Sequence, residues 1–380
     1  MRILITTSPG LGHILPTISF AHAARAAGHD VLYATGGSVN AISEAGLQVV
    51  DASPDTDYAQ IFMGAGAKLR EQMQAAQDDV QRTMELGLKL FAKVSEPTLD
   101  SVVRVAEKWQ PDVIVHTPLQ AAGQLAAGKL GVPLVSVQLA MGPDRMFTGH
   151  EQITRDELRE YFDRHGVASV PNTAALLSVT PPSVRGTGEV PDTVWPMRYV
   201  PYNGGSVVPE WLLDKPERRR VLITLGTVVP HFGLGMLEPV VAAASKVDAE
   251  FVLALGNVDL SALGELPENV RAVGYLPLGV LLSSCDAAIH HGGAGTTMTI
   301  VDAGIPQIVV PQGADQFLNA DTVQENGVGQ RATVGDVDVA LIERLLGDAD
   351  WRANALRMRD ELRAMPSPVE VVERLAGFVG

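Results

Sequence analysis

Residues 286–297 decide the fold and read DAAIHHGGAGTT. An apolar run ends in two histidines, and a glycine-rich turn then leads into a segment with the character of a helix. The order of strand, glycine turn and helix is typical of a parallel α/β unit. Glycine lets the backbone approach a ligand closely, and a helix N-terminus presents free N–H groups. We therefore expect a phosphate group to bind at this turn.

The same arrangement occurs twice in the chain. Residues 2–6 (RILIT) recur as residues 220–224 (RVLIT), and residues 112–116 (DVIVH) recur as residues 286–290 (DAAIH). Short β-branched runs alternate with longer alanine-rich segments around both copies. This pattern predicts an α/β protein of two Rossmann-like domains that face each other across a cleft. Ligands of such sheets bind at the carboxyl ends of the strands, so we expect both domains to contribute to one site.

Turn residues and spacing predict the domain boundaries. The turn-forming stretch 201–205 (PYNGG) predicts a first domain over residues 1–205, a second over 206–368, and a C-terminal helix over 369–380 that packs back on the first domain. Arg2 to Asp112 spans 110 positions and Arg220 to Asp286 spans 66, so the first copy holds 110 − 66 = 44 extra residues. They fall around residues 55–96, in a stretch rich in Met, Gln and Ala. Such side chains suit a pocket for a bulky apolar molecule, although ordinary helix packing uses them more often.

Composition limits the location and the partners. The chain has 380 residues, 46% of them hydrophobic, which allows both domains a proper core. A formal net charge of −15 argues against binding to nucleic acid or to an anionic membrane. The sequence has neither a signal-peptide pattern nor an apolar stretch long enough to span a membrane. We therefore expect a cytoplasmic protein, and the sequence leaves a homodimer open.

The second domain supplies the candidate phosphate-binding residues. The turn at residues 291–297 offers backbone N–H groups, two threonine hydroxyls and a histidine side chain, all suited to phosphate oxygens. The end of the strand over residues 221–225 adds a further contact. These candidates are His291, Gly292, Gly293, Ala294, Gly295, Thr296, Thr297, Gly226 and Thr227. A turn that merely caps a helix is the alternative interpretation.

Two further pairs lie at the ends of later strands. Asp315 and Gln316 follow a buried strand, and their carboxylate and carboxamide are suited to neighbouring sugar hydroxyls. Alternatively, Asp315 caps the next helix. The backbone of Leu276 and Pro277 is a candidate for pairing with a pyrimidine base, with an ordinary turn as the alternative.

The first domain supplies a candidate base. Residues 10–16 (GLGHILP) place His13 at the start of a helix that faces the cleft. An imidazole there can remove a proton from an acceptor hydroxyl, although a histidine at a helix start can also act as a cap. The Gly-x-Gly of this turn lacks the remainder of a dinucleotide fingerprint, and Pro16 lies where that helix would run.

Three Asp-x-Asp triplets are candidate metal ligands, at residues 55–57, 336–338 and 348–350. All three have the sequence context of turns or helix caps rather than of a core strand's end. A phosphate held at a helix N-terminus has no need of a cation. We expect no metal and no other cofactor.

Residues 10–16, 198–204, 290–297 and 311–320 together resemble the actinomycete natural-product glycosyltransferases of the two-Rossmann (GT-B) fold, in order along nearly the whole chain. The resemblance implies an inverting, metal-independent transfer of a deoxysugar from a dTDP-sugar, less often a UDP-sugar, to a polyketide or other aglycone. It also implies that the acceptor binds in the first domain and the donor in the second. His13 would be the general base, His291 with Thr296 and Thr297 would hold the diphosphate, and Asp315 with Gln316 would contact the sugar. Leu276 and Pro277 would contact the base.

The chain departs from the family at one position. Members with a catalytic dyad often carry an acid after the strand that matches residues 113–115, whereas this chain continues HTPLQ over residues 116–120. Thr117, Gln120 or Asp144 remain candidates for orienting His13. The alternative is that no residue orients His13, because the acceptor is acidic enough to react without it. A phenol or a carbon of an electron-rich ring would be such an acceptor.

Two other functions remain open at this stage. A nucleotide-sugar 2-epimerase of the same fold would use the same donor site, but its acidic catalytic groups are not recognisable here. A catalytically inactive partner of another glycosyltransferase would need neither His13 nor an intact diphosphate turn.

Overall fold

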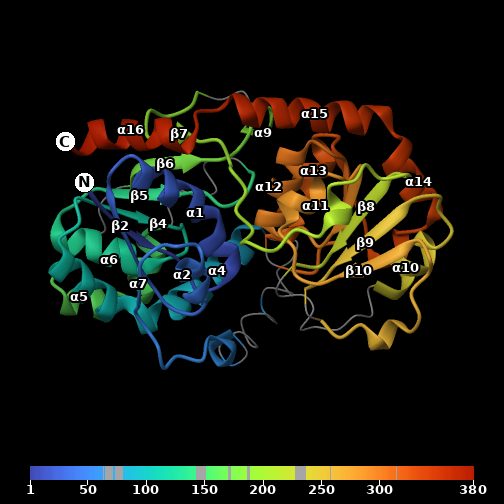
Figure 1. The fold of residues 1–380 in the computed structure, drawn as a ribbon. Coiled ribbons are helices and arrows are strands. Elements are labelled where there is room, and N and C mark those ends of the chain that lie inside the picture. Colours follow the sequence, from blue (N-terminus) through green and yellow to red (C-terminus); the bar gives the residue numbers. More distant parts are fainter. Residues whose placement is uncertain are drawn as a thin grey trace.

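The computed structural model describes residues 1–380 except 63, 65–71, 73–79, 143–150, 170–172, 186–188, 227–236, 257 and 314, and gives only the backbone of 80–84, 151 and 152. Two α/β domains lie side by side (Figure 1). Each is a parallel sheet covered by helices, which confirms the predicted fold class.

The first domain contains a seven-stranded parallel sheet in the order β3-β2-β1-β4-β5-β6-β7. Its strands are β1 (Arg2–Thr6), β2 (Asp30–Thr35), β3 (Val49–Asp51), β4 (Val113–His116), β5 (Leu134–Val137), β6 (Thr173–Ser178) and β7 (Val194–Pro196). Its helices are α1 (Leu11–Ala26), α2 (Asn40–Glu44), α4 (Val80–Ser95), α5 (Leu99–Trp109), α6 (Ala121–Leu130), α7 (Glu151–Glu157), α8 (Arg159–Arg164) and α9 (Pro182–Arg185). Every residue of β4 and β5 is buried, because helices cover both faces of the sheet.

The second domain contains a six-stranded parallel sheet in the order β10-β9-β8-β11-β12-β13. Its strands are β8 (Arg220–Thr224), β9 (Glu250–Ala254), β10 (Val270–Val273), β11 (Ala287–His290), β12 (Gln307–Val309) and β13 (Gly329–Arg331). Its helices are α10 (Leu237–Ala244), α11 (Leu278–Leu282), α12 (Ala294–Ala303), α13 (Gln316–Glu325), α14 (Val339–Gly347) and α15 (Ala349–Ala364), and α16 (Pro368–Val379) ends the chain.

The sequence repeat is a structural repeat. The Arg2 N–H donates to Asp112 Oδ2 over 2.6 Å, and the Arg220 N–H donates to Asp286 Oδ2 over 3.0 Å, so both copies begin with the same contact. In each sheet the strand order reverses at the first strand, between β1 and β4 and between β8 and β11. Such switch points are where open α/β sheets bind their ligands.

Helix α1 begins earlier than the proline had suggested. It starts at Leu11 and includes Pro16, so His13 lies in its first turn. Pro16 has no N–H to donate to the carbonyl of Gly12, four residues earlier, and the helix continues despite that missing bond.

The 44 extra residues lie between β3 and α5, and nothing comparable separates β10 from α11. Met63 and Met73 fall outside the described residues, whereas the last part of the insertion forms α4.

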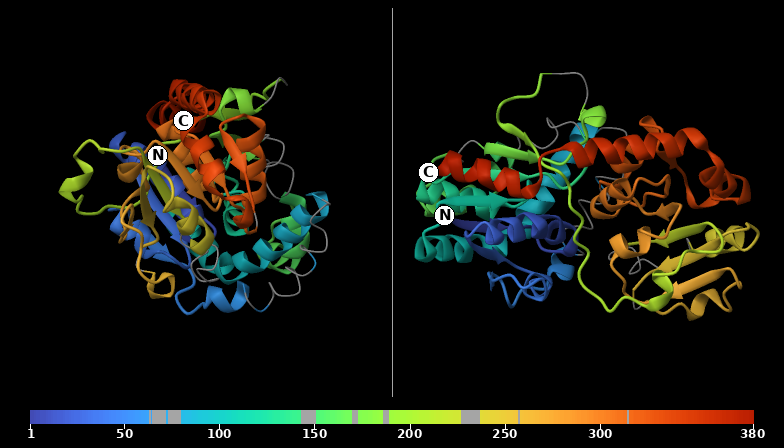
Figure 2. Two further views of the ribbon diagram at one scale, coloured as in Figure 1. Left: turned by 90° about the vertical axis from the view of Figure 1, so that its right-hand side faces the viewer. Right: turned by 45° about the horizontal axis from the view of Figure 1, so that its top comes forward.

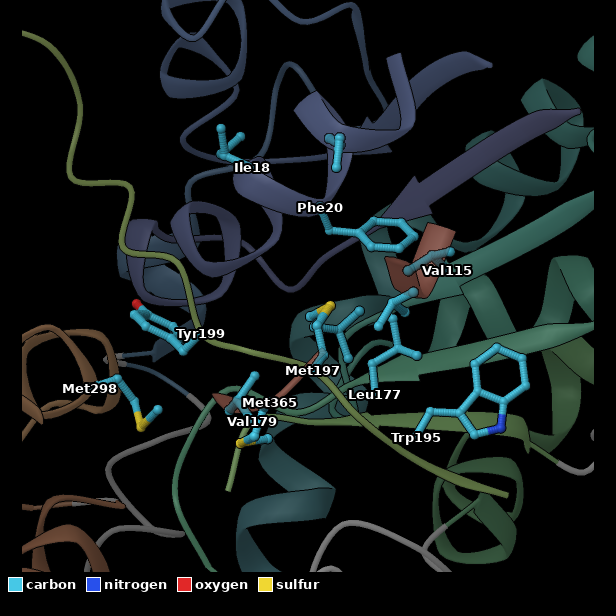
Figure 3. Close-up of a cluster of buried hydrophobic side chains, with 14 of the residues drawn as sticks. Ile18, Phe20, Val115, Leu177, Val179, Trp195, Met197, Tyr199, Met298 and Met365 are labelled. Atoms are coloured by element: carbon cyan, nitrogen blue, oxygen red, sulfur yellow. The ribbon is translucent and has the colours of Figure 1, made fainter. Parts of the chain in front are cut away.

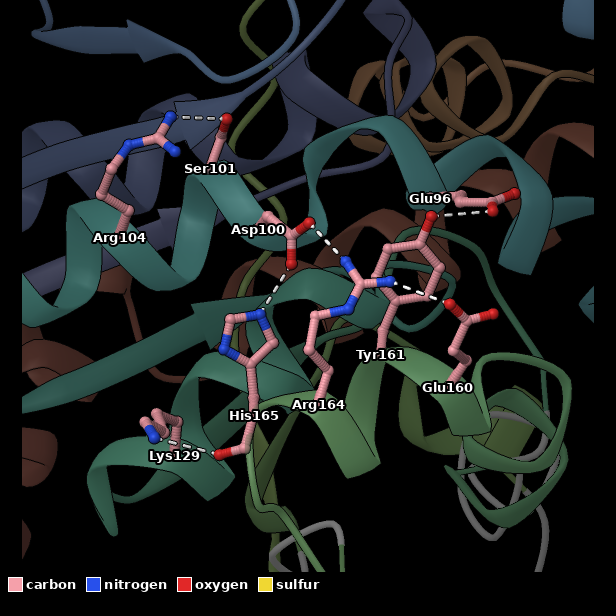
Figure 4. Close-up of polar contacts among 9 residues, drawn as sticks. All are labelled: Glu96, Asp100, Ser101, Arg104, Lys129, Glu160, Tyr161, Arg164 and His165. Carbon is pink, nitrogen blue, oxygen red and sulfur yellow. Dashed lines mark hydrogen bonds and ion pairs between the residues drawn. The ribbon is translucent and has the colours of Figure 1, made fainter.

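The C-terminal end of α8 is bonded to the start of α5. Arg164 Nη1 lies 2.9 Å and His165 Nε2 lies 2.7 Å from the two oxygens of Asp100 (Figure 4).

The chain crosses between the domains twice, and the two crossings touch. The Arg198 N–H, after β7, donates to the Pro366 carbonyl between α15 and α16 over 2.7 Å. Beyond this point α16 lies along the first domain, where it packs on α1 (Figures 1 and 2). One apolar cluster therefore joins both domains. Tyr199, in the segment between the domains, and Met298, on α12, lie near Met365 and the core of the first sheet (Figure 3).

Among the described residues, no helix combines the length and apolar character that crossing a membrane requires.

Candidate active site

His290 is an internal support of the glycine turn. Its Nε2 lies 2.8 Å from Gln307 Oε1, and its Nδ1 accepts a hydrogen bond from the Gly292 N–H over 3.1 Å. The Gly292 contact requires an unprotonated Nδ1, so the proton is on Nε2 and is donated to Gln307. Burial lowers the pKa of His290 to about 3, so the ring stays neutral. Both nitrogens are used inside the protein, and His290 fixes the turn rather than binding a ligand.

The His291 ring lies between two glycines. A Cβ placed on Gly226 would come within 2.4 Å of His291 Cε1, and one on Gly293 within 2.5 Å of His291 Nε2. Gly226 also has a φ of +67°, which side chains rarely adopt. The ring interacts with the Thr224 carbonyl, and burial lowers its pKa to about 4. Its Nδ1 is buried and has no hydrogen-bond partner in the described part of the chain.

Helix α12 begins directly after this turn. Gly293 is its N-cap without a side-chain cap, and the first intrahelical bond runs from the Thr297 N–H to the Gly293 carbonyl over 2.9 Å. The N–H groups of residues 294–296 therefore lack acceptors within the helix. The Thr297 hydroxyl donates to the same carbonyl over 3.0 Å, which differs from the expected phosphate contact. Thr296, the other threonine expected to bind phosphate, is largely buried.

Asp315 faces α12. It is the N-cap residue of α13, but its carboxylate makes no capping bond there. Instead Oδ2 accepts from Asn319 Nδ2 over 3.1 Å, and the Ala294 N–H also favours the charged form. Burial raises the pKa of Asp315 against these donors. The structure thus brings the candidate sugar-binding acid to the start of the candidate phosphate-binding helix.

Gln316 is turned toward its own loop. Its Oε1 accepts from the Gln312 N–H over 2.8 Å and from the Gly313 N–H over 3.3 Å. The carboxamide oxygen is therefore committed to the protein, and the NH2 group is the part suited to an external acceptor.

Leu276 and Pro277 lie in the turn between β10 and α11. Pro277 is the N-cap of α11, and Leu276 packs in a cluster with residues of that helix. Beside them, the Tyr275 hydroxyl donates to the Asn203 carbonyl, and Asn203 Oδ1 accepts from the Gly279 N–H over 3.2 Å. The segment that joins the domains is therefore fastened to this turn.

His13 lies in an aromatic environment at the end of the first sheet. The centroid of its ring is 5.3 Å from that of Phe91 on α4, and Phe91 is in turn 6.2 Å from Phe62. Burial lowers the pKa of His13 to about 4, and no other cause contributes. The imidazole is therefore neutral at ordinary pH and able to accept a proton.

None of the described candidates for orienting His13 bonds to it. Its buried Nδ1 has no hydrogen-bond partner among the described residues. The Thr117 hydroxyl accepts from the Ser8 N–H over 3.2 Å, and Gln120 Nε2 donates to the Thr7 carbonyl over 2.7 Å. Asp144 and Thr227 lie outside the described residues.

The Asp-x-Asp triplets contain turn and cap residues, as their context predicted. Asp57 accepts from the Gln60 N–H, and Asp336 forms a capping box with Thr333. Asp338 caps α14, and Asp348 caps α15. Within the described ranges no three His, Cys, Asp or Glu side chains form a group that could hold a metal ion.

Two supporting residues escaped the sequence analysis. Asn319 donates to both Asp315 and the Gly292 carbonyl, and its position four residues after Asp315, on the same face of a helix, is the signal that could have revealed it. Tyr199, in the segment between the domains, interacts with Thr299 on α12, and burial raises the pKa of its hydroxyl to about 12. No pattern in the sequence marks that contact.

Two parallel-sheet α/β domains, with a glycine turn and a helix N-terminus at the switch point of the second sheet, are the architecture of the GT-B class of glycosyltransferases. The profile of the N-terminal domain of the erythromycin biosynthesis protein CIII-like family matches residues 22–226, and that of its C-terminal domain matches residues 238–378. The chain is 36% identical to elloramycin glycosyltransferase ElmGT of Streptomyces olivaceus, over 99% of this chain and 97% of that one.

Solved structures agree. Glycosyltransferase SnogD of Streptomyces nogalater is 42% identical, covers 100% of this chain and 99% of its own, and superposes with a TM-score of 0.86. SsfS6 of Streptomyces sp. SF2575, solved with thymidine diphosphate, is 27% identical with 99% of each chain covered and a TM-score of 0.82. The chain belongs to the erythromycin biosynthesis protein CIII-like family and is a natural-product glycosyltransferase. This identification favours the transferase over the epimerase and the inactive partner.

Proposed function

We propose that this enzyme transfers a deoxysugar from a dTDP-sugar to a polyketide or aromatic aglycone, with inversion and without a metal ion. UDP-sugars are the less favoured donors. The observation that carries the proposal is the position of Asp315 against the N-terminus of α12, because a carboxylate suited to sugar hydroxyls lies there beside a helix N-terminus suited to a diphosphate. The thymidine diphosphate complex of SsfS6 supports the choice of nucleotide.

The diphosphate would lie at the start of α12. The N–H groups of Gly295 and Thr296 and the positive end of the helix dipole favour its negative charge, whereas the Ala294 N–H bonds Asp315. His291 is neutral, because burial lowers its pKa to about 4, so it would contribute a hydrogen bond through Nδ1 rather than a charge. The sugar would lie beside Asp315 and next to the α12 N-terminus, with the NH2 group of Gln316 donating to a hydroxyl. Leu276 and Pro277 would lie against the base.

The transfer needs one proton acceptor. His13 would take the proton of the acceptor hydroxyl as its oxygen attacks the anomeric carbon. The bond from that carbon to the diphosphate oxygen breaks, and its electron pair leaves with the diphosphate. The charge that grows on the leaving group is stabilised by the amides of α12, which takes the place of a cation. Attack from the face opposite the diphosphate inverts the configuration.

The low pKa of His13 limits the acceptor. A base whose conjugate acid has a pKa of about 4 draws a proton from an alkanol poorly, because the two acidities differ too widely. A phenolic hydroxyl, or an electron-rich ring carbon that loses its proton late, suits such a base better. The ring of Phe91 beside His13, with Phe62 packed against Phe91, suits a flat aromatic acceptor as well.

The test has two parts. Thymidine diphosphate should raise the melting temperature of the enzyme, and dTDP-sugars offered with phenolic aglycones should yield inverted glycosides in the presence of a metal chelator. Products only with added divalent cation, or with the donor's configuration retained, would refute the mechanism. Stabilisation by uridine diphosphate but not by thymidine diphosphate would refute the choice of donor.

A further inference from the structure

Asn319 joins the two parts of the donor site. Its side chain is 0% exposed in the second turn of α13. Nδ2 donates to the Gly292 carbonyl over 2.7 Å and to Asp315 Oδ2 over 3.1 Å. One NH2 group therefore spans the gap between the glycine turn that precedes α12 and the acid that faces α12.

The side chain is placed for its donors rather than for packing. Asn319 Oδ1 is buried and has no hydrogen-bond partner among the described residues, an arrangement that costs stability. An apolar side chain of similar size would avoid this cost. A fully buried amide whose NH2 group is hydrogen-bonded and whose oxygen is not is explained if the NH2 group has a function in the site.

The hydrogen bond from Asn319 to the Gly292 carbonyl restrains the backbone of the glycine turn. Gly292 has a φ of +91°, and a Cβ there would come within 2.7 Å of Val309 Cγ1 and 3.0 Å of the Gln316 carbonyl oxygen. The glycine turn thus packs directly on the first turn of α13. By holding the Gly292 carbonyl, Asn319 fixes the distance between this turn and Asp315.

We propose that Asn319 is a positioning residue that couples sugar recognition by Asp315 to the diphosphate turn. It keeps the carboxylate of Asp315 aimed at α12 and charged. This inference rests on the proposed function, in which Asp315 accepts hydrogen bonds from the donor sugar.

The surroundings of Asp315 make its charge sensitive to Asn319. Burial raises the pKa of Asp315, and the donors that oppose this are its own backbone N–H, the Asn319 side chain on α13 and the Ala294 N–H on α12. The two histidines at the end of β11, His290 and His291, are both neutral, because burial lowers their pKa values to about 3 and about 4. Loss of the Asn319 donor should therefore raise the pKa of Asp315 further, and the carboxylate would take up a proton at a higher pH.

Calorimetric binding of dTDP-glucose and of thymidine diphosphate, over a series of pH values, tests the coupling without an acceptor. The difference between the two ligands reports the sugar contact alone. In Asn319→Leu, binding of dTDP-glucose at neutral pH should weaken about tenfold, as expected for a lost hydrogen bond to a charged group. The pH below which the sugar's contribution disappears should also rise. Asn319→Asp, which keeps the shape but removes the donors, should change in the same direction and serves if the leucine variant does not fold.

Asn354 provides a matched control. Its Nδ2 donates to the Gly327 carbonyl over 3.0 Å, the same type of contact in the same domain. Asn354→Leu should leave both affinities and their pH dependence unchanged. Wild-type binding and pH dependence in both Asn319 variants, or equal changes in Asn354→Leu, would overturn the coupling.

Asp315→Asn separates the two proposals. If it removes the sugar's contribution while the Asn319 variants do not, the inference about Asn319 alone is wrong. If it leaves that contribution intact, the sugar contact of Asp315 is wrong and the role of Asn319 falls with it.

Discussion

The imidazole of His13 is held by the ring of Phe91, with 5.3 Å between the centroids and 54° between the planes. No described side chain bonds to its buried Nδ1. An acid in this place would both orient the ring and raise its basicity, whereas an aromatic neighbour brings no charge, and burial lowers the pKa of His13 to about 4. The His13 imidazole is thus unprotonated at every physiological pH, but it is a weaker base than an ordinary histidine.

The first prediction concerns this contact. Phe91→Ser should admit water to His13 and raise its pKa from about 4 toward the ordinary value near 6.5. Phe91→Leu, which keeps the site apolar, should leave the pKa low. Titration of isotope-labelled histidines by NMR measures both without substrate. A His13 pKa that is equal in the wild type and in Phe91→Ser would show that the aromatic contact does not set it.

The second prediction concerns catalysis. His13→Ala should lower kcat by roughly a hundredfold or more, because the acceptor proton loses its base. In the proposed function His13 acts on the acceptor hydroxyl and not on the diphosphate, so the affinity for thymidine diphosphate should stay unchanged. Steady-state rates with a phenolic aglycone and calorimetric nucleotide binding measure the two effects. Full activity of His13→Ala would end its assignment as the base.

The third prediction concerns the glycines around His291. Gly226→Ala and Gly293→Ala should each displace the His291 ring, because the new Cβ would come within 2.4 Å and 2.5 Å of it. We expect a loss of roughly 1–3 kcal/mol in unfolding free energy and at least tenfold weaker binding of thymidine diphosphate. Gly347→Ala is the control, since no atom lies within 4 Å of its added Cβ. Normal nucleotide binding in both variants would show that the ring's position is unimportant.

The fourth prediction concerns stability and pH. His13, His290 and His291 have pKa values of about 4, about 3 and about 4, lowered by burial, whereas an unfolded histidine titrates near 6.5. As the pH falls below 6.5 the unfolded chain binds protons that the folded chain refuses, so the free energy of unfolding falls toward pH 4. His290→Asn should be less stable than the wild type at neutral pH, and the difference should shrink as the pH falls. Urea unfolding at several pH values measures this, and a constant difference would contradict it.

The fold could be predicted because its repeat is written in the sequence. Residues 2–6 and 220–224 became the equivalent strands β1 and β8, and the glycine turn at residues 292–293 became the junction of β11 and α12. Long apolar runs predict central strands well, because those strands are buried on both faces. The short strands β3, β7 and β13 have three residues each and lie at or near the sheet edges, too short for a pattern.

The candidate site was predictable at strand ends and not beyond them. His291, Asp315 and His13 follow strands, so topology alone brings them to the switch points. The direction of each side chain depends on contacts that are distant in sequence. Gln316 bonds its own loop, Thr297 bonds its own helix, and Phe91 reaches His13 from another element, none of which a local pattern encodes.

The hydrogen bond between the Arg198 N–H and the Pro366 carbonyl has a mechanical consequence. Two chain crossings that meet at one place favour rotation about that place over sliding, so we expect any relative motion of the domains to be a rotation about this edge. A small rotation there would move the atoms near Arg198 and Pro366 little and the atoms on the opposite side of the domains most.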